Sequence, residues 1–457
     1  MLKSNLENSK AKAFNMTEGS ILKTILFFAI PIFIGNIFQQ LYNVADTAVI
    51  GNLLGDNSLA AVGASAPIYS LIIAFASGLT NGFSVIIARF FGANDTENLN
   101  KAVSLTYVLT AAMSLALTVI SMISIRPLLN VLNTPIEIID ETESYLRVIL
   151  LFCVITMAYN MLAGMMRALG NSRAPLYFLM IASVINVVLD IIFVKYLPWG
   201  IAGAAYATVI AQLVSVICCY IYCTKKCKTL LFSKKNLVFE KWLISDLFAT
   251  GLSMGLMYAI VCVGSVIMQS AINSLGADTI TAHTAARKID DIFMLPLGTI
   301  SMAASTFASQ NYGAGKMDRV KKGIINSFYI AFAWSGFSCL VAFAFNRPLI
   351  KMLTGTSNSY IIDTASKYIQ INIPLFFILS ILLILRSSLQ GLGRKLVPIC
   401  GSIIEFVLKV VAVGYAVPTL GYFGICILEP VIWCVCSVVV LVDFILFMKK
   451  TTKPVTH

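Results

Sequence analysis

The stretch Val184-Ile185-Asn186-Val187-Val188-Leu189-Asp190-Ile191-Ile192 places an amide and a carboxylate inside an apolar run. Asn186 and Asp190 are four residues apart, so on a helix they share one face and lie one turn from each other. An ionisable group at membrane depth costs at least about 2.5 kcal/mol even on lenient insertion scales, and it usually faces a polar cavity. The stretch therefore predicts a membrane-spanning helix with a functional polar face. The alternative is a buried aspartate that only ties two helices together.

The composition is typical of a chain that lies in a bilayer. Of its 457 residues, 58% are hydrophobic and only 12% are charged, whereas soluble domains carry about 25% charged residues. The formal net charge of +12 would suggest nucleic acid as the partner of a soluble protein. Here the basic residues stand mainly between apolar segments, where they orient a membrane protein. We therefore expect a polytopic membrane protein whose partner is the lipid bilayer, with no nucleic-acid partner.

Hydropathy indicates twelve apolar segments that are long enough to cross a bilayer as helices, which takes about 20 residues each. The predicted spans lie near residues 21–50, 58–87, 102–125, 145–166, 175–197, 201–223, 245–272, 282–308, 323–345, 364–386, 396–417 and 424–448. The expected fold class is an all-α membrane protein with twelve transmembrane helices.

Basic residues are distributed unequally between the two sides of these spans. Of the 33 Lys and Arg residues, 24 fall in the N-terminus, the even-to-odd connections and the C-terminus, and 7 fall in the opposite connections. The remaining two, Arg147 and Lys409, fall inside predicted spans and are counted on neither side. Because cytoplasmic loops carry the excess of Lys and Arg, we predict a cell-membrane protein with both termini cytoplasmic.

The chain also repeats itself, with motifs of the first half recurring in the second half at a nearly constant offset. Arg126-Pro127-Leu128-Leu129 recurs as Arg347-Pro348-Leu349-Ile350, and Gly200 recurs as Gly421. Two halves of six spans each would insert with the same orientation, which is typical of transporters and not of simple pores. The predicted organisation is a cytoplasmic N-terminal segment 1–20, an N-lobe 21–223, a basic cytoplasmic linker 224–244, a C-lobe 245–448 and a cytoplasmic tail 449–457.

Three different helices of the first half place polar groups at a similar depth in the membrane. Asp46 lies about five residues inside the outer end of the first span. Asp190 lies eight residues before Pro198, near the outer end of the fifth span, and Thr208 lies eight residues after Gly200, near the outer start of the sixth. Carboxylate, amide and hydroxyl oxygens are hard ligands suited to Na⁺. Two desolvated carboxylates close together would also share a proton. The residues therefore predict a site for Na⁺ or H⁺.

Pro31 interrupts the first span and predicts a bend, either as a moving hinge or as a static kink. The second half carries different chemistry from the first. At the repeat positions of Asn186 and Thr208 it has Lys409 and Glu429, and Glu405 precedes Lys409 by one helical turn. These three charges predict a buried ion-paired triad between helices eleven and twelve, and the alternative is that they line the cavity and handle substrate or protons.

A further group of charges begins the eighth predicted span. We interpret His283, Arg287, Lys288, Asp290 and Asp291 mainly as a solvated helix end, with the alternative that Asp290 faces the cavity. No Gly-rich phosphate loop, Ser/His/Asp set or metal-ligand cluster stands out, so an enzyme is not expected. The 11 Cys residues are interpreted as small packing residues in a reducing compartment.

The pattern of twelve spans in two parallel halves, with Pro31 and Asp46 in the first helix, resembles the multidrug and toxic-compound extrusion (MATE) family of the MOP fold. The resemblance covers residues 18 to 448 and is closer to DinF-like than to NorM-like members, because helix seven offers only Gln269 where some members carry an acid. It implies two pseudo-symmetric lobes around a cavity that opens alternately to either side. It further implies an N-lobe site made by Asp46, Asn186, Asp190 and Thr208, with Tyr145 and Asn160 nearby.

The resemblance also implies a function. We expect an antiporter that uses entry of H⁺ or Na⁺ to export amphipathic, often cationic drugs and toxic compounds, as a monomer and without a cofactor. The alternative is a lipid-linked precursor flippase of the same superfamily. Such flippases tend to have a strongly basic cavity, whereas this chain places an acidic pair in its N-lobe.

Overall fold

The computed structural model describes residues 15–197 and 199–451. Most of the predicted N-terminal segment 1–20, most of the tail 449–457, and Pro198 lie outside these residues. Within them every regular element is a helix. Eleven helices are long and apolar enough to cross a membrane, and a twelfth span is formed if one bent pair is counted together. The chain is thus an all-α multi-pass membrane protein, as the hydropathy predicted, because only helices satisfy every backbone group within a single segment in lipid.

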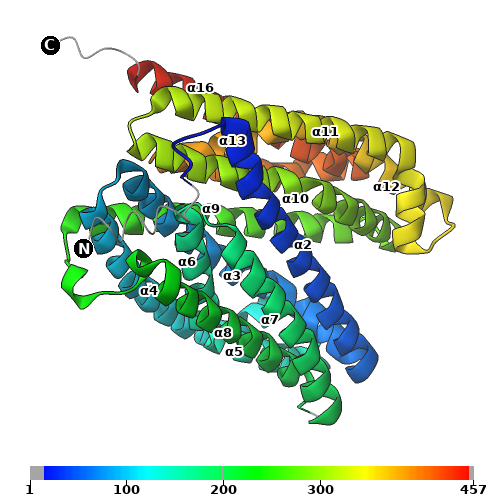
Figure 1. The fold of residues 1–457 in the computed structure, drawn as a ribbon. Coiled ribbons are helices and arrows are strands. Elements are labelled where there is room, and N and C mark those ends of the chain that lie inside the picture. The colour runs from blue at the N-terminus through cyan, green and yellow to red at the C-terminus, as the bar shows by residue number, and fades with distance from the viewer. Residues whose placement is uncertain (1–14, 198, 452–457) are drawn as a thin grey trace. The chain divides into compact units, whose positions relative to one another are not determined.

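The described residues divide into two compact units, of which the first contains residues 15–16 and Ile30–Tyr258. α3, α4 and α6 lie side by side in it, and α7 packs along α8 (Figure 1). Its helices are α2 (Ile21–Leu54, from Ile30 onward), α3 (Asp56–Ala93), α4 (Thr96–Val131), α5 (Ile139–Leu151), α6 (Cys153–Ala168), α7 (Arg173–Ile191), the π-helix η1 (Ile192–Tyr196), α8 (Gly200–Lys226), the 3₁₀-helices η2 (Lys228–Leu230) and η3 (Lys234–Asn236), and α9 (Lys241–Asn273, up to Tyr258).

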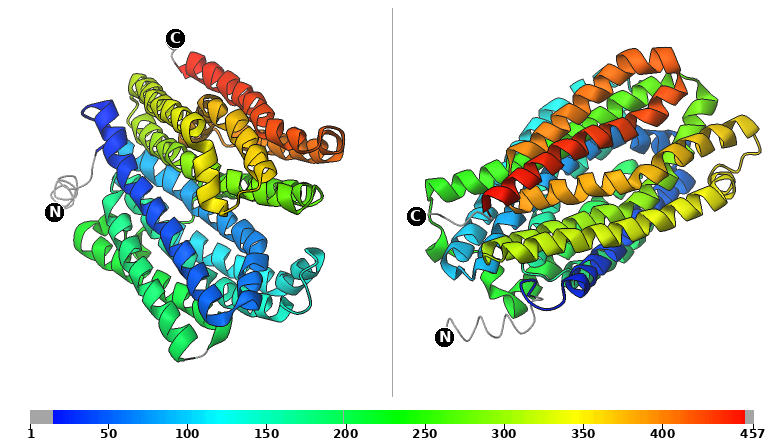
Figure 2. Two further views of the ribbon diagram at one scale, coloured as in Figure 1. Left: turned by 90° about the vertical axis from the view of Figure 1, so that its right-hand side faces the viewer. Right: turned by 90° about the horizontal axis from the view of Figure 1, so that it is seen from above.

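The second unit contains Thr17–Ala29 and residues 259–451, so α2 and α9 each run from one unit into the other. α10 packs against α11 and α13, and α14 packs against α16 (Figure 2). Besides the parts of α2 and α9, its helices are α10 (Ala277–Gly313), α11 (Met317–Thr354), α12 (Ser359–Asn372), the 3₁₀-helix η4 (Ile373–Leu375), α13 (Phe376–Gly391), α14 (Leu396–Val411), the π-helix η5 (Ala412–Ala416), α15 (Val417–Leu420) and α16 (Tyr422–Thr451).

The sequence repeat is reproduced in the backbone. Gly55 and Gly276, which precede α3 and α10, have φ values of 87° and 94°, a conformation that favours glycine. Gly200 and Gly421 have φ values of 57° and 58°. A π-helical turn follows α7 and another follows α14, so even this rare irregularity occurs in both halves. The two halves are therefore built on one local plan.

The fourth predicted span differs from a simple helix. α5 and α6 are separate helices that meet at Phe152 with a bend of 47°. α2, in contrast, is one continuous helix that contains Pro31, and the change from one unit to the other falls between Ala29 and Ile30, directly before this proline. The predicted hinge at Pro31 is thus placed at that division, and its motion stays a prediction.

The basic segment 224–244, predicted as a linker, contains two short 3₁₀-helices. Its two 3₁₀ turns pack on α4, where the Tyr107 hydroxyl donates to the Leu230 carbonyl at 2.9 Å. The Ser233 amide donates to the Ser104 hydroxyl at 3.3 Å. These contacts hold the segment on the first unit, while the division between the compact units falls later, within α9. The predicted lobe limits at 223 and 245 stay a prediction.

Candidate functional site

The predicted carboxylates of the first half lie together. Asp46 on α2 and Asp190 on α7 are both buried, with 8% and 0% of their surface exposed, and their carboxyl groups are close enough to interact with each other. Among the described residues, no protein donor reaches either oxygen of Asp190 or the Oδ1 atom of Asp46. A hydrogen bond between two carboxyl groups needs a proton on one of them, since ionised carboxylates only accept. Buried, unpaired carboxylate oxygens are also what a bound cation would require.

Asn186 and Thr208 complete the oxygen-rich end of this site. The Asn186 Nδ2 atom donates to the Thr208 hydroxyl at 3.4 Å, and both side chains are buried. The Asn186 Oδ1 atom has no partner within the described chain. One turn separates Asn186 from Asp190 on α7, so the amide oxygen and the carboxylate face the same way. The structure thus brings the four predicted residues Asp46, Asn186, Asp190 and Thr208 into one region.

The other two predicted first-half residues lie at different distances from this centre. Tyr145 on α5 is buried, and its hydroxyl is close enough to interact electrostatically with Asp46 and Asp190. Asn160 instead donates from Nδ2 to the Ser77 hydroxyl at 3.2 Å, which ties α6 to α3. Asn160 therefore belongs to a neighbouring polar cavity and not to the carboxyl pair itself.

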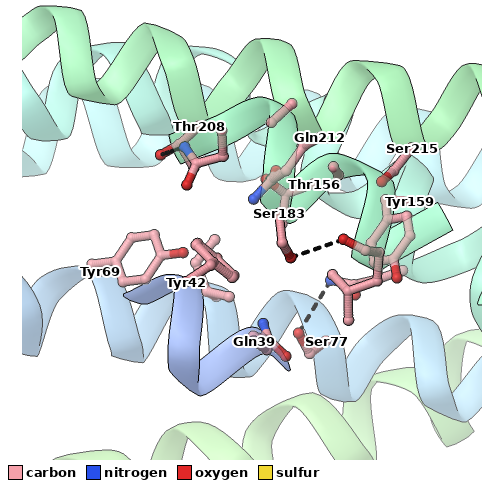
Figure 3. A pocket seen from close by; sticks show the side chains of 16 residues that line it. Gln39, Tyr42, Tyr69, Ser77, Thr156, Tyr159, Ser183, Thr208, Gln212 and Ser215 are labelled. Atoms are coloured by element: carbon pink, nitrogen blue, oxygen red, sulfur yellow. Dashed lines mark hydrogen bonds between the residues drawn. The ribbon is translucent and has the colours of Figure 1, made fainter. Parts of the chain in front are cut away.

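That cavity has a volume of about 80 Å³ and lies wholly within the first unit. Figure 3 shows Tyr42, Tyr69 and Thr208 toward one end of it and Tyr159 and Ser215 toward the other. Its lining is mostly uncharged and polar: Gln39, Tyr42, Tyr69, Ile73, Ser77, Thr156, Tyr159, Asn160, Leu179, Ala182, Ser183, Asn186, Thr208, Ala211, Gln212 and Ser215. Pockets for drug-sized ligands typically measure about 300–1,000 Å³. In this conformation the cavity therefore has room for a few waters or a hydrated cation, and not for a whole amphipathic compound.

Several of these lining residues were missed in the sequence. Gln39 and Tyr42 lie on α2 at seven and four residues before Asp46, so the three share one helix face. That spacing could have identified them. Thr156 and Gln212 come from different helices and meet at 2.5 Å, a contact with no signal in the sequence.

In the second half the predicted triad is formed. Lys409 Nζ lies 3.0 Å from Glu405 Oε1 and 3.4 Å from Glu429 Oε1, and only 2% of Lys409 is exposed. Arg386 on α13 joins it, with Nη1 at 3.5 Å from Glu405 Oε2. The predicted span 364–386 ended at Arg386, but α13 continues to Gly391, and this arginine is buried. Two cations and two carboxylates therefore balance one another.

Gln269 does not contribute to this cluster. Its side chain is exposed on α9 and donates to Asn273 Oδ1 at 2.9 Å. The interpretation of the start of the eighth span as a solvated helix end is wrong for two of its members. His283 and Asp290 face inward on α10 and are 3% and 0% exposed, and Arg287 pairs with Asp290 at 3.3 Å. Helix packing, which charge patterns do not reveal, buries them.

Comparisons with known proteins show what the chain is similar to. The MatE family profile matches residues 31–192 and 253–415, one match in each half. The chain is 31% identical over 310 residues to the probable multidrug resistance protein YpnP of Bacillus subtilis, covering 68% of this chain and 69% of that protein. It is 24% identical over 390 residues to the probable multidrug resistance protein YoeA of the same organism, covering 84% of both.

Among solved structures, the fold matches an outward-facing multidrug resistance MATE transporter of the MOP superfamily, with a TM-score of 0.87. The match covers 97% of this chain and 99% of that one, at 23% sequence identity. At this sequence identity the match shows that the two proteins share a fold.

Proposed function

This chain belongs to the MatE family of membrane transporters, and on this premise we propose that it is a cation-coupled antiporter that exports amphipathic, often cationic compounds from the cell by alternating access. It is a transporter and not an enzyme. The observation that carries the proposal is the buried Asp46–Asp190 pair, whose free oxygens need a proton or a metal cation. No cofactor is required, since the energy comes from the gradient of H⁺ or Na⁺.

The coupling follows from the cost of an unpaired charge. A carboxylate that is buried without its partner costs several kcal/mol, and moving a two-state equilibrium from 1:99 to 99:1 takes about 5.5 kcal/mol. Neutralisation of the Asp46–Asp190 pair is therefore large enough to reverse the preference between inward-open and outward-open states. Asn186 and Thr208 would complete a Na⁺ shell or orient the protonated acid.

Exchange follows because a cationic substrate and the coupling cation compete for the same negative charge. Exchange of one monovalent cation for one singly charged cationic substrate moves no net charge, so the driving force is the concentration gradient of the coupling ion. A tenfold gradient of H⁺ or Na⁺ supplies about 1.4 kcal/mol, which corresponds to about a tenfold concentration ratio of substrate. Pro31 is proposed as the hinge of α2, next to the point where this helix changes unit. Both termini are proposed to be cytoplasmic, the working unit a monomer, and the subtype DinF-like.

The test is export of ethidium by purified protein in proteoliposomes, with a pH gradient or a Na⁺ gradient imposed separately. We expect Asp46→Asn and Asp190→Asn each to abolish gradient-driven export, because each change removes a charge that the cation must neutralise. The control is Asp56→Asn, an exposed aspartate at the start of α3 that should leave export unchanged. Full activity in both site variants would contradict the proposed coupling site.

If the wild-type protein exports ethidium under neither gradient, multidrug antiport is refuted. Movement of a lipid-linked precursor by that same preparation would then favour the flippase alternative.

A further inference from the structure

The second half carries a counterpart of the first-half site. By the offset of the sequence repeat, Asn186 on α7 corresponds to Lys409 on α14, and Thr208 on α8 corresponds to Glu429 on α16. Each pair is in contact: Asn186 Nδ2 lies 3.4 Å from Thr208 Oγ1, and Lys409 Nζ lies 3.4 Å from Glu429 Oε1. The same helix crossing thus brings a neutral pair together in one half and a charged pair in the other.

The local backbone around both positions is also similar. A π-helical turn begins at Ile192, six residues after Asn186, and another begins at Ala412, three residues after Lys409. Such turns are rare and are frequent at functional sites. The correspondence therefore extends beyond single residues to the shape of the helix that carries them.

The two sites differ in how their negative charge is compensated. In the first half, Asp46 and Asp190 leave carboxylate oxygens without any protein donor among the described residues. In the second half, the ammonium group of Lys409 lies between Glu405 and Glu429, at 3.0 Å and 3.4 Å. The second half therefore already holds a cationic group between carboxylate oxygens. In the first half, a cation between Asp46 and Asp190 would have to bind from solution.

The second half makes room for this lysine. Gly264 on α9 packs against it, and a Cβ atom added to this glycine would lie 2.9 Å from Lys409 Cδ. Arg386 occupies the remaining oxygen of Glu405 at 3.5 Å. All four charged residues of this cluster are less than one-tenth exposed.

We propose that the Lys409 ammonium is a tethered cation, which fills the second-half counterpart of the first-half cation site. This position takes no exchangeable ion, and the exchangeable cation binds only at Asp46 and Asp190. The inference rests on the proposed function, because it assumes that the first-half site binds a cation. Removal of the lysine would leave Glu429 without its cation, and this carboxylate would then bind one H⁺ or monovalent metal cation.

The experiment measures cation binding and does not depend on transport. Purified protein is tested for ²²Na⁺ binding at pH 8 by scintillation proximity and, in parallel, for proton uptake by difference titration between pH 8 and pH 5. The variants are Asp190→Asn, Asp190→Asn with Lys409→Met, and that double variant with Glu429→Gln added. The two arms distinguish Na⁺ from H⁺ as the ion.

We expect Asp190→Asn to lose the exchangeable cation of the wild type. Addition of Lys409→Met should restore about one Na⁺ or H⁺ per protein, and further addition of Glu429→Gln should remove it again. If Lys409→Met adds no cation, the tethered-cation proposal is overturned and the triad is only an ion pair between helices. If Asp190→Asn binds cations like the wild type, the coupling site of the proposed function fails instead.

A reciprocal variant tests the same idea if loss of the lysine prevents folding. Asn186→Lys places an ammonium group at the first-half position, beside the polar cavity that Asn186 lines. It should abolish cation binding although Asp46 and Asp190 are intact, whereas Asp56→Lys, which adds the same group at an exposed position outside the site, should not. Wild-type cation binding by folded Asn186→Lys would overturn the proposal.

Discussion

Substitution of Gly82 by alanine should separate two helices that touch at their backbones. α3 carries Gly78 and Gly82 and α9 carries Gly251 and Gly255, so each helix has a small-xxx-small pattern, and the two patterns face each other. Close backbone approach of this kind is a common way in which helices associate in membranes, where lipid removes the hydrophobic driving force.

The magnitude follows from the geometry. A Cβ atom on Gly82 would lie 2.5 Å from the Gly251 Cα atom and 2.7 Å from the Thr250 carbonyl oxygen. Ordinary contacts begin at about 3.4 Å, and both obstacles are backbone atoms that cannot rotate away, so the helices must part by roughly 0.9 Å. Overpacking of this kind costs typically about 1–3 kcal/mol, and we expect the upper part of that range for Gly82→Ala.

The matched control lies in the same helix. Gly63 on α3 has no atom within 4 Å of an added Cβ, so Gly63→Ala should be neutral or stabilising by up to about 1 kcal/mol, since alanine favours helices over glycine. Thermal unfolding in detergent, followed by size-exclusion chromatography, compares the two variants. A Gly82→Ala protein that is as stable as Gly63→Ala would refute the argument from backbone contact.

Two further predictions concern contacts at the starts of α2 and α9. Arg319 donates to the carbonyls of Glu18 and Gly19 at 2.6 Å and 2.9 Å. Arg319→Ala should therefore release the start of α2 and lower the stability of the folded protein by about 1–3 kcal/mol. Limited proteolysis near residue 18 should become faster than in the wild type. Lys101 and Trp242 donate to Glu240 and hold its pKa below the ordinary value of 4.5. Because a lowered pKa stabilises the folded state only while the group is ionised, thermal stability should fall more steeply below pH 4.5 in the wild type than in Glu240→Gln, and equal slopes would contradict this.

Much of the fold could be predicted because a bilayer leaves few alternatives. Each apolar segment must form a helix, and motifs that recur at a nearly constant offset indicate two halves before any contact is known. The triad of Glu405, Lys409 and Glu429 could also be anticipated, since two members share a helix face and the third occupies a repeat position.

The features that the sequence did not predict have one physical cause in common. Helix ends and helix packing depend on tertiary contacts, which a single sequence does not show. The tenth predicted span ended at Arg386 because hydropathy falls near a charged residue, whereas α13 continues to Gly391 and buries this arginine against Glu405. The bend at Phe152 leaves no proline or glycine signal in the sequence. Burial of His283 and Asp290 depends on which face of α10 meets its neighbours.

The two halves compensate their buried carboxylates in different ways, and this difference bears on function. A carboxylate at membrane depth must be compensated, and a duplicated scaffold offers two places to do so. At Glu405 and Glu429 the compensating charge is part of the chain, at 3.0 Å and 3.4 Å, so it cannot leave with an ion gradient. At Asp46 and Asp190 no such group is present among the described residues, so on the proposed function the compensating ion comes from solution. On the proposed function only the Asp46–Asp190 site can couple transport to a gradient. Work is extracted only when the neutralising cation binds from one side of the membrane and is released to the other.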